Sequence, residues 1–303
     1  MDLISIITIN YNCYLETTEF LDSIRNNLTC RGYSYEMIVV DNASTTDDVT
    51  LLKNRYSWVK VISSSQNRGF SGGNNLGIEH ASGNYYLFIN NDVIIDHDIV
   101  IPLLNRFRQS DKIGVVTPKI LDFDTSRIIY AGSKPLGKFL IRIHYYDDEV
   151  SACKSFPIPY APGTAMLVKK EVVDKVGFWP EIYFLYEEEL DWCLSIGRHG
   201  YEIWYDSNAS IYHKGSMTTG KNSPLVQYYT TRNRLLIFKR NLRGRYKYCS
   251  IIFTLGVSIP QRCLKYFIIS VFCFFSDGRF CCSFFIRVST VLNSLTQGIS
   301  ARQ

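Results

Sequence analysis

The sequence predicts an α/β fold in which a mostly parallel sheet is flanked by helices on both faces. Through the first half of the chain, apolar runs of strand length alternate with amphipathic runs of helix length. The strand-like runs are apolar throughout, as in strands that are buried on both sides. Near residue 225 the composition becomes basic and aromatic. We therefore expect an α/β body over residues 1–224 and a helical extension over residues 225–303.

The expected elements follow one another in regular order. The run ISIITI predicts the first strand, at residues 4–9, and a helix follows with its apolar side chains on one face, at residues 16–28. The next strands are expected at 35–40, 58–62, 84–89 and 112–120, with helices between them at 45–56, 71–81 and 96–109. Residues 122–160 show no clear period and predict an irregular insertion with room for a hairpin. The remaining elements are a strand at 165–168, helices at 171–177 and 189–200, and a strand at 201–206.

Charge is unevenly distributed along the chain. The whole sequence carries +5, yet the residues from Leu225 onward contain 12 Lys and Arg against one acid, which leaves the body at −6. Such an asymmetry suggests an anionic partner. A membrane surface, a phosphate-bearing substrate and a nucleic acid are the three alternatives. Nine cysteines without a Cys-x-x-Cys pair favour the reduced thiols of a cytosolic protein. The N-terminus has no basic segment before its apolar run, so we expect no signal peptide.

Polar residues follow three of the expected parallel strands. They are Asn10 to Asn12 after the first strand, Asp41 and Asn42 after the second, and Asn90 to Asp92 after the fourth. Ligands of such sheets bind at the carboxyl ends of the strands, so these residues form a candidate binding site. Asn and Asp are also common turn residues, which is the alternative interpretation.

A second candidate site lies at the expected helix over residues 189–200, where the acids Glu187, Glu188, Glu189 and Asp191 cluster. Acids in a first helical turn complement the helix dipole, which is the structural interpretation. The functional interpretation is a carboxylate that acts as a general base beside a cleft.

The extension contains a basic, aromatic stretch at residues 225–250 and two apolar runs at 251–260 and 266–275. Each apolar run is about half the length that a membrane-spanning helix requires. We expect amphipathic helices that lie on an anionic membrane surface. A small helical subdomain packed on the body is the alternative.

These motifs resemble the family-2 inverting glycosyltransferases with a GT-A fold, and more narrowly the bacterial rhamnosyltransferase-like members. The resemblance covers about residues 3–240 and keeps the family's order. It is carried by SIITINYN, IVVDNASTTD, NRGFSGGNNLGI, YYLFINNDV, PGTAMLVKKEVVDKVGFW, FLYEEELDWCL, IYHKGS and YYTTRNRLL. It implies a nucleotide-sugar half at about residues 1–120 and an acceptor half at about 121–224.

The resemblance also implies roles for the donor-side residues. INND stands where the family carries its DXD-type motif, with Asn90 at the first acid position and Asp92 at the last. Asp92 and His213 would hold a divalent cation, Mg²⁺ or Mn²⁺, against the diphosphate. The residues implied to bind the nucleotide sugar are Thr8, Asn10, Asn12, Asp41, Asn67, Arg68, Gly69, Asn90 and Asn91.

On the acceptor side, Glu189 stands where the family's catalytic base is usually an Asp, and Glu188 or Asp191 could serve instead. Gly163 and Thr164 resemble the turn that lines the acceptor. Arg232 and Asn233 match a stretch that follows the catalytic domain, and we expect them to bind the diphosphate or the lipid-linked acceptor.

The implied function is transfer of a sugar, rhamnose being one candidate, from a dTDP- or UDP-linked donor to a lipid-linked oligosaccharide. The product would be a bacterial surface polysaccharide such as O-antigen or capsule, made on the inner face of the cytoplasmic membrane. One alternative is a nucleotide-binding or nucleic-acid-binding protein, which the acidic body and the missing RNA motifs disfavour. Another is a catalytically inactive scaffold, which the departures at Asn90 and Glu189 would permit. No nucleic-acid partner is expected, and the sequence leaves the oligomeric state open.

Overall fold

The computed structural model describes residues 1–45, 49–145, 152–215, 223–261 and 264. The chain forms two compact units. The first comprises residues 1–135 and 142–218, and the second comprises residues 136–141 and the chain from residue 219 onward.

The first unit is an α/β structure. Its strands are β1 (Asp2–Asn10), β2 (Tyr33–Asp41), β3 (Val59–Ser63), β4 (Tyr85–Ile89), β5 (Val93–Ile94), β6 (Ile113–Asp122), β7 (Ile128–Tyr130), β8 (Phe156–Ile158), β9 (Ala165–Lys169) and β10 (Glu202–His213). Its helices are α1 (Tyr14–Asn27), α2 (Val49–Arg55), α3 (Gly69–Glu79), α4 (Val100–Phe107), α6 (Lys170–Val176), the 3₁₀ turn Glu181–Tyr183 and α7 (Glu188–Arg198).

The strands form one sheet in the order β3-β2-β1-β4-β9-β6-β10-β5, with β7 paired to β6 and β8 to β10. The first four strands of this order are parallel, as expected. Beyond β4 the long strands β6 and β10 also pair parallel with each other, but β9 runs antiparallel between β4 and β6 and interrupts the expected mostly parallel sheet. The short strands β5, β7 and β8 also pair antiparallel. The sheet is therefore mixed, since β9 reaches it from the long insertion instead of through a βαβ crossover.

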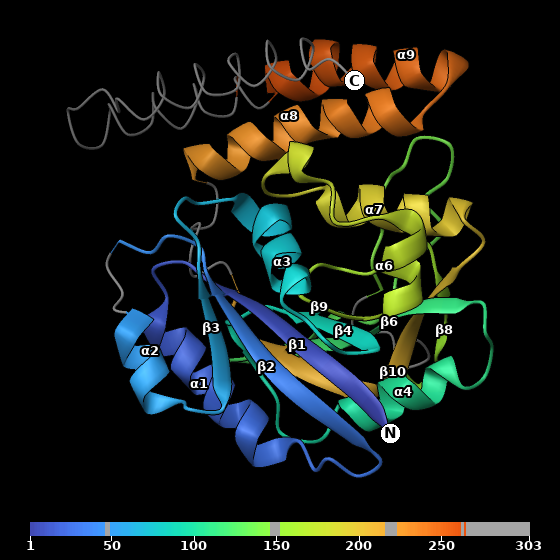
Figure 1. The fold of residues 1–303 in the computed structure, drawn as a ribbon. Coiled ribbons are helices and arrows are strands. Elements are labelled where there is room, and N and C mark those ends of the chain that lie inside the picture. The colour runs from blue at the N-terminus through green and yellow to red at the C-terminus, as the bar shows by residue number, and fades with distance from the viewer. Residues whose placement is uncertain (46–48, 146–151, 216–222, 262–263, 265–303) are drawn as a thin grey trace. The chain divides into compact units, whose positions relative to one another are not determined.

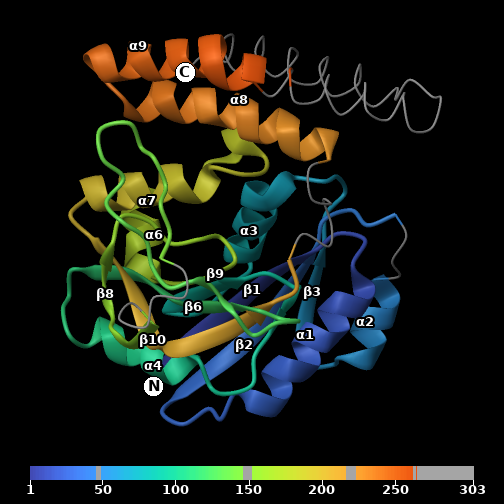
Figure 2. The same cartoon turned by 180° about the vertical axis from the view of Figure 1, so that it is seen from behind.

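Helices cover both faces of this sheet, with α3, α6 and α7 on one face and α1, α2 and α4 on the other (Figures 1 and 2). Side chains alternate along β1, so Ile7 and Ile9 face α3. A Cβ added at Gly73 or Gly77 of α3 would lie 2.7 or 2.4 Å from those isoleucine side chains. The glycines of this helix thus allow it to pack directly on the sheet.

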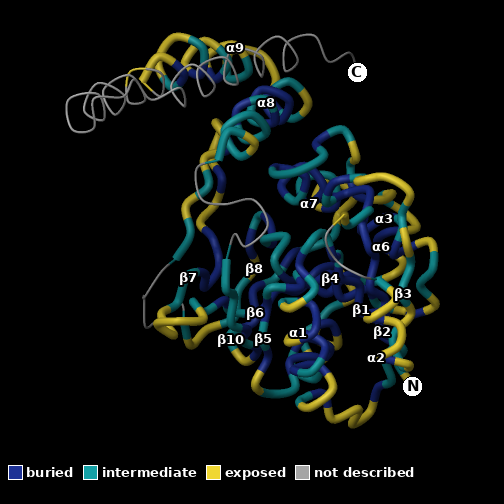
Figure 3. The backbone as a smooth tube through the Cα atoms, turned by 90° about the vertical axis from the view of Figure 1, so that its left-hand side faces the viewer, coloured by how far each residue is buried: buried dark blue, intermediate teal, exposed yellow. Residues whose placement is uncertain are grey.

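The buried residues of the first unit concentrate in the sheet strands (Figure 3). An aromatic cluster fixes α7 on the same face as α3. The Phe88 ring on β4 packs against Trp179 and Trp192, with centroids 5.3 and 5.8 Å apart, and the two indoles lie 4.4 Å from each other. Trp192 belongs to α7, so this cluster determines where the acidic start of the helix lies.

The insertion over residues 122–160 contains the hairpin that the sequence left room for. Strand β7 pairs with β6, and the chain then folds back so that Lys134 N donates to Ile143 O and Tyr145 N donates to Gly132 O. Both arms of this hairpin belong to the first unit, whereas its tip, residues 136–141, belongs to the second. The residue that follows the tip is Arg142.

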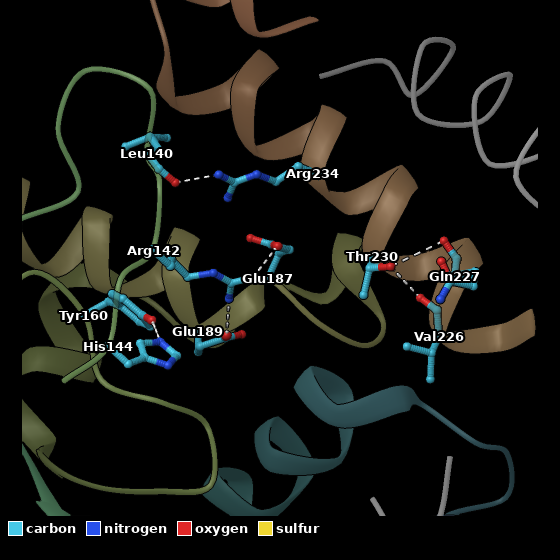
Figure 4. Close-up of polar contacts among 10 residues, drawn as sticks. All are labelled: Leu140, Arg142, His144, Tyr160, Glu187, Glu189, Val226, Gln227, Thr230 and Arg234. Atoms are coloured by element: carbon cyan, nitrogen blue, oxygen red, sulfur yellow. Dashed lines mark hydrogen bonds and ion pairs between the residues drawn. The ribbon is translucent and has the colours of Figure 1, made fainter. Parts of the chain in front are cut away.

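The second unit contains the helices α8 (Pro224–Asn241) and α9 (Gly244–Phe253), the latter continuing into a π-helical turn at Thr254–Ser258. Ser223 caps α8 by accepting a hydrogen bond from Val226 N, and Pro224 occupies the first turn, where its missing N–H costs nothing. Arg234 of α8 donates to Leu140 O at 2.5 Å, which attaches the hairpin tip to this unit (Figure 4).

The described helices include none that is both long and apolar enough to cross a membrane. The first apolar run of the extension falls in α9 and the π-helical turn, and the second, residues 266–275, lies outside the described residues. The described residues include five cysteines, and none of these is assigned to a disulfide: Cys13, Cys30, Cys153, Cys193 and Cys249. The other four of the sequence also lie outside the described part.

Candidate active site

The three polar strand ends meet in one chain of buried hydrogen bonds. Asn91 Nδ2 donates to Thr17 Oγ1 at 2.8 Å, and Thr17 donates to Asn10 Oδ1 at 2.9 Å. Asn10 Nδ2 in turn donates to Asp41 Oδ1 at 2.9 Å, and Ser44 Oγ donates to the same oxygen at 2.6 Å. These hydrogen bonds link the residues at the ends of β1, β2 and β4. This series of hydrogen bonds also includes Thr17 of α1, which the sequence analysis did not identify as a site residue.

The loop at residues 67–69 is attached to the end of β2 by Asn42. The Asn42 side chain donates to Asn67 Oδ1 at 3.1 Å and to Gly69 O at 3.0 Å, and its own oxygen accepts from Arg68 N at 2.9 Å. Sequence analysis included Asn42 among the strand-end residues of the candidate site but implied no nucleotide-sugar-binding role for it. The structure shows that its side chain holds the loop at residues 67–69.

Gly69 lies where two segments approach closely. Its φ is +67°, and a Cβ there would lie 2.2 Å from Phe184 O. The next residue, Phe70, donates its N–H to that carbonyl at 2.7 Å. The start of α3 is thereby joined to the segment that leads into α7.

Asp92 and His213 face each other although 120 positions of sequence separate them. The two-residue strand β5 begins directly after Asp92 and pairs with the end of β10, opposing Val93 to His213. His213 Nε2 consequently lies 3.2 Å from Asp92 Oδ1. That oxygen is buried and accepts no hydrogen bond within the described part of the chain.

This pair fits a divalent cation. A buried carboxylate oxygen without a donor, beside an imidazole nitrogen, is a donor set that Mn²⁺ accepts, and Mg²⁺ would use the carboxylate. No group of three or more His, Cys, Asp or Glu suited to a metal occurs among the described residues. A cation held by Asp92 and His213 would need further ligands besides these two side chains.

The turn at residues 163–164 lies between the end of β4 and the start of α7. Asn90 N donates to Thr164 O at 2.9 Å, which fixes the turn beside the end of β4. A Cβ at the neighbouring Gly163 would lie 3.9 Å from Glu189 Cβ and 3.3 Å from the Phe70 ring. The turn therefore lies next to the side chain of Glu189.

The chain enters α7 through a strained backbone. Phe184, Tyr186 and Glu187 have φ values of 64°, 69° and 75°, in the left-handed region that non-glycine residues rarely adopt. α7 then begins at Glu188, as the acid cluster predicted. Conformations of this kind persist only where the surroundings hold them, and they concentrate at functional sites.

An arginine holds two of the carboxylates at this helix start. Arg142 Nη2 lies 2.6 Å from Glu187 Oε1, and Nη1 lies 3.0 Å from Glu189 Oε1 (Figure 4). Sequence reasoning missed Arg142 because it lies in the insertion without clear period, and no local motif marks it. Only the folded chain brings it to partners more than forty residues away.

The three glutamates differ in their surroundings. Burial and the neighbouring charge of Glu189 raise the pKa of Glu188 well above its usual value, and its Oε2 accepts no hydrogen bond from any residue described. Burial also raises the pKa of Glu189, while Arg142 opposes the rise. Burial disfavours the charge on Arg142, yet Glu187 and Glu189 outweigh it and raise the arginine pKa. Glu189 is thus the carboxylate with a cation beside it and a side chain that stays 15% exposed.

The other predicted site residues are placed as follows. Thr8 is buried inside β1, two residues before its end. Asn12 adopts φ 54° and accepts a hydrogen bond from Thr45 N. Asp191 is buried in the first turn of α7. Arg232 and Asn233 belong to α8 of the second unit, where Arg232 donates to Asn233 Oδ1 at 2.7 Å.

Comparison with protein families identifies this arrangement. Residues 5–177, more than half of the chain, match the family described as "Glycosyl transferase family 2". The chain belongs to glycosyl transferase family 2. The matched segment runs from within β1 to beyond β9 and therefore contains the strand ends, the INND motif and the 163–164 turn of this glycosyltransferase.

Curated relatives of this glycosyltransferase act on glycans. "Low-salt glycan biosynthesis hexosyltransferase Agl10" of Haloferax volcanii is 25% identical over 265 residues, covering 83% of this chain and 82% of the relative. "Poly-beta-1,6-N-acetyl-D-glucosamine synthase" of Staphylococcus aureus is 26% identical over 212 residues. That match covers 66% of this chain but only 48% of the synthase.

Solved structures share the GT-A fold of this glycosyltransferase at low sequence identity. GalNAc-T7 with UDP, GalNAc and Mn²⁺ has a TM-score of 0.65 at 15% identity, over 82% of this chain and 49% of that one. The mannosyltransferase PcManGT from Pyrobaculum calidifontis, in complex with GDP-Man and Mn²⁺, has a TM-score of 0.58 at 12% identity, over 99% of this chain and 88% of that one. S. aureus TarS 1-349 with UDP-GlcNAc has a TM-score of 0.55 at 17% identity, over 99% and 81%.

Proposed function

We propose that this family 2 glycosyltransferase transfers a sugar with inversion from a nucleoside diphosphate donor to a hydroxyl of a lipid-linked oligosaccharide. The observation that carries the proposal is the 163–164 turn. It is hydrogen-bonded to Asn90 on one side and adjoins Glu189 on the other. A donor held at the strand ends would then place its sugar toward the carboxylates of α7.

The proposed reaction is a single displacement. The acceptor oxygen forms a bond to the anomeric carbon from the face opposite the diphosphate, whose bond to that carbon breaks with the electron pair leaving on phosphate. Glu189 takes the proton of the acceptor hydroxyl. A divalent cation between Asp92 and His213 would neutralise charge on the departing diphosphate. Asp41, Asn10 and the loop at residues 67–69 would hold the nucleotide.

The comparisons support the proposal for the sugar donor and the product. PcManGT and TarS were solved with GDP-Man and UDP-GlcNAc, and the two curated relatives are named for glycan biosynthesis and polysaccharide synthesis. We propose a UDP- or dTDP-linked hexose, with rhamnose as one candidate, and a surface polysaccharide as the product. Arg232 and Asn233 are proposed to bind the acceptor diphosphate, and the basic extension to attach the enzyme to the inner face of the cytoplasmic membrane.

The test measures release of free nucleoside diphosphate from a panel of UDP-, dTDP- and GDP-sugars with Mg²⁺ or Mn²⁺, with and without a membrane lipid extract. We expect release with one donor. Asp92→Ala and Glu189→Gln should each lower it by a factor on the order of 100 or more.

Glu171→Gln is the matched control, because Glu171 is also an acid in a first helical turn, that of α6, and is exposed. It should leave release unchanged. Release that survives in Glu189→Gln would move the base to Glu188 or Asp191. No release with any donor would overturn the proposed function and favour an inactive scaffold.

A further inference from the structure

We propose that Arg142 is a positioning residue that holds Glu187 and Glu189 in one arrangement, so that the Glu189 carboxylate meets the acceptor in a fixed orientation. This inference rests on the proposed function of Glu189 as the base. It assigns a role to a residue of the insertion hairpin that lies in none of the motifs quoted for the family resemblance.

The geometry is that of a planar cation between two carboxylates. The guanidinium uses Nη1 for Glu189 Oε1, at 3.0 Å, and Nη2 for Glu187 Oε1, at 2.6 Å. The two bonds engage one oxygen of each carboxylate and fix the rotation of both side chains. Oε1 of Glu189 is thereby occupied by the guanidinium, and backbone N–H groups of Glu187 and Glu189 also stabilise the charge on this carboxylate.

Arg142 is itself held in place. Its guanidinium carbon lies 6.0 Å from the centroid of the Tyr160 ring, which is buried and contacts His144. Lys134 N donates to Ile143 O at 2.9 Å, so the residue following Arg142 is fixed in the hairpin ladder. An arginine anchored by its backbone and by an aromatic face can position its partners instead of following them.

The electrostatic consequence depends on every group that faces Glu189. The charged and titratable groups around it come from α7, the hairpin and the segment before β9: Glu187, Glu188, Cys193, Arg142 and Tyr160. Arg142 is the single cation in this described set. It opposes the rise of the Glu189 pKa that burial and Glu187 cause.

Two substitutions should therefore move the pKa of Glu189, and with it the acid limb of the pH profile, in opposite directions. In Arg142→Met the cation is lost, so the pKa of Glu189 rises further and the base is protonated at higher pH. The acid limb of the kcat/KM profile should shift upward by about one pH unit or more. In Glu187→Gln a like charge is lost and Arg142 serves Glu189 alone, so the limb should shift to lower pH. Arg142→Lys, which keeps the charge but cannot bridge both carboxylates, should lie between Arg142→Met and the wild type.

Arg106→Met is the matched control. Arg106 is a half-buried arginine of the same unit that pairs with the buried Asp206 at 2.8 Å, away from α7. Its substitution should lower the midpoint of thermal unfolding without moving the catalytic pH profile. If Arg142 had a purely structural role, Arg142→Met would lower activity equally at every pH and leave the acid limb of the kcat/KM profile unmoved. That outcome would overturn the proposal.

A second readout needs no substrate and separates this inference from the proposed function. Glu188 and Glu189 have raised pKa values in the folded protein, so the stability they contribute when protonated is lost as pH rises through those values. Removing Arg142 enlarges this loss. The destabilisation of Arg142→Met in thermal unfolding should grow as pH rises above the unfolded glutamate pKa of about 4.3. An equal loss at all pH values would overturn the inference, even if the wild type transfers sugar. If Arg142→Met does not fold, the downward shift in Glu187→Gln decides.

Discussion

Asp98 is the junction of three segments at the scale of single residues. Its Oδ2 accepts hydrogen bonds from Thr29 N at 2.8 Å, from Thr29 Oγ1 at 2.6 Å and from Tyr33 OH at 2.8 Å, and its Oδ1 accepts from Val100 N at 3.0 Å. Burial opposes the charge, yet the bonds from Thr29 and Tyr33 outweigh it and hold the pKa of Asp98 below its usual value. The carboxylate thus joins the end of α1, the start of β2 and the start of α4.

Substitution of Asp98 should lower the free energy of unfolding by an amount that depends on pH. Because the folded pKa is depressed, the stability is present above the unfolded value of about 3.9 and is lost as pH falls through the folded value. Asp98→Asn should lose about 1–3 kcal/mol of unfolding free energy at neutral pH, and the difference should shrink below about pH 4. Urea unfolding across pH measures it. Asp124→Asn, at an exposed position, should stay within about 0.5 kcal/mol of the wild type, and a pH-independent difference for Asp98→Asn would contradict the argument.

Residue-scale prediction from the sequence succeeded where the signal was local. The acids at 187–191 marked a helix start because helix dipoles favour acids there, and α7 does begin at Glu188. The pairing of Asp92 with His213 was implied only by resemblance, and a strand of two residues creates it. Arg142 could not be predicted, since its importance comes from partners that are distant in sequence and carries no periodicity of its own.

At the scale of elements, the junction between α3 and the segment before α7 depends on Gly69. The predicted helix began at Ser71, but α3 begins at Gly69, where the backbone meets Phe184. The sequence indicated a helix through its apolar face but did not reveal that its first residue contacts another element. The same limit applied to β9, whose strand character was predicted and whose antiparallel direction was not.

Gly69→Ala should therefore lower the free energy of unfolding by more than the left-handed backbone angle at this position would alone. The added Cβ would lie 2.2 Å from Phe184 O, whereas at Gly32, with φ +85°, a Cβ meets nothing within 4 Å. Both substitutions pay for a left-handed conformation, and only the first also collides. We expect Gly69→Ala to lose about 2–4 kcal/mol more unfolding free energy than Gly32→Ala. Chemical unfolding of the two variants compares them directly, and equal losses would mean that the contact with Phe184 is not rigid.

At the scale of the whole molecule, charge separates two parts of the chain. The basic residues of the second unit include Arg243 and Arg245, which are exposed, and Lys247. If the extension binds an anionic membrane surface, as we propose, replacing these three by Gln should weaken binding to phosphatidylglycerol vesicles by about 1 kcal/mol for each charge. Cosedimentation at low and high salt measures the effect, and salt should weaken the wild type more than the variant.

The control for this prediction removes the same amount of charge from the first unit. Lys53, Lys112 and Lys154 are exposed there, and their replacement by Gln should leave vesicle binding near the wild-type value. Equal weakening by both sets would indicate that net charge matters and its location does not. Binding to neutral phosphatidylcholine vesicles that matches binding to anionic ones would contradict the electrostatic proposal.

The position of β9 has a consequence for how the protein is made. β4 is complete once residue 89 has been synthesised, but its neighbour on one side, β9, starts only at Ala165. During synthesis the N-terminal strands can pair among themselves while one edge of β4 waits for a partner that has not yet left the ribosome. Open edges of this kind invite association with other chains. The hydrogen bond from Asn90 N to Thr164 O also forms late. The candidate site at the strand ends is therefore complete only after the nascent chain has passed through a stage in which one edge of β4 is unpaired.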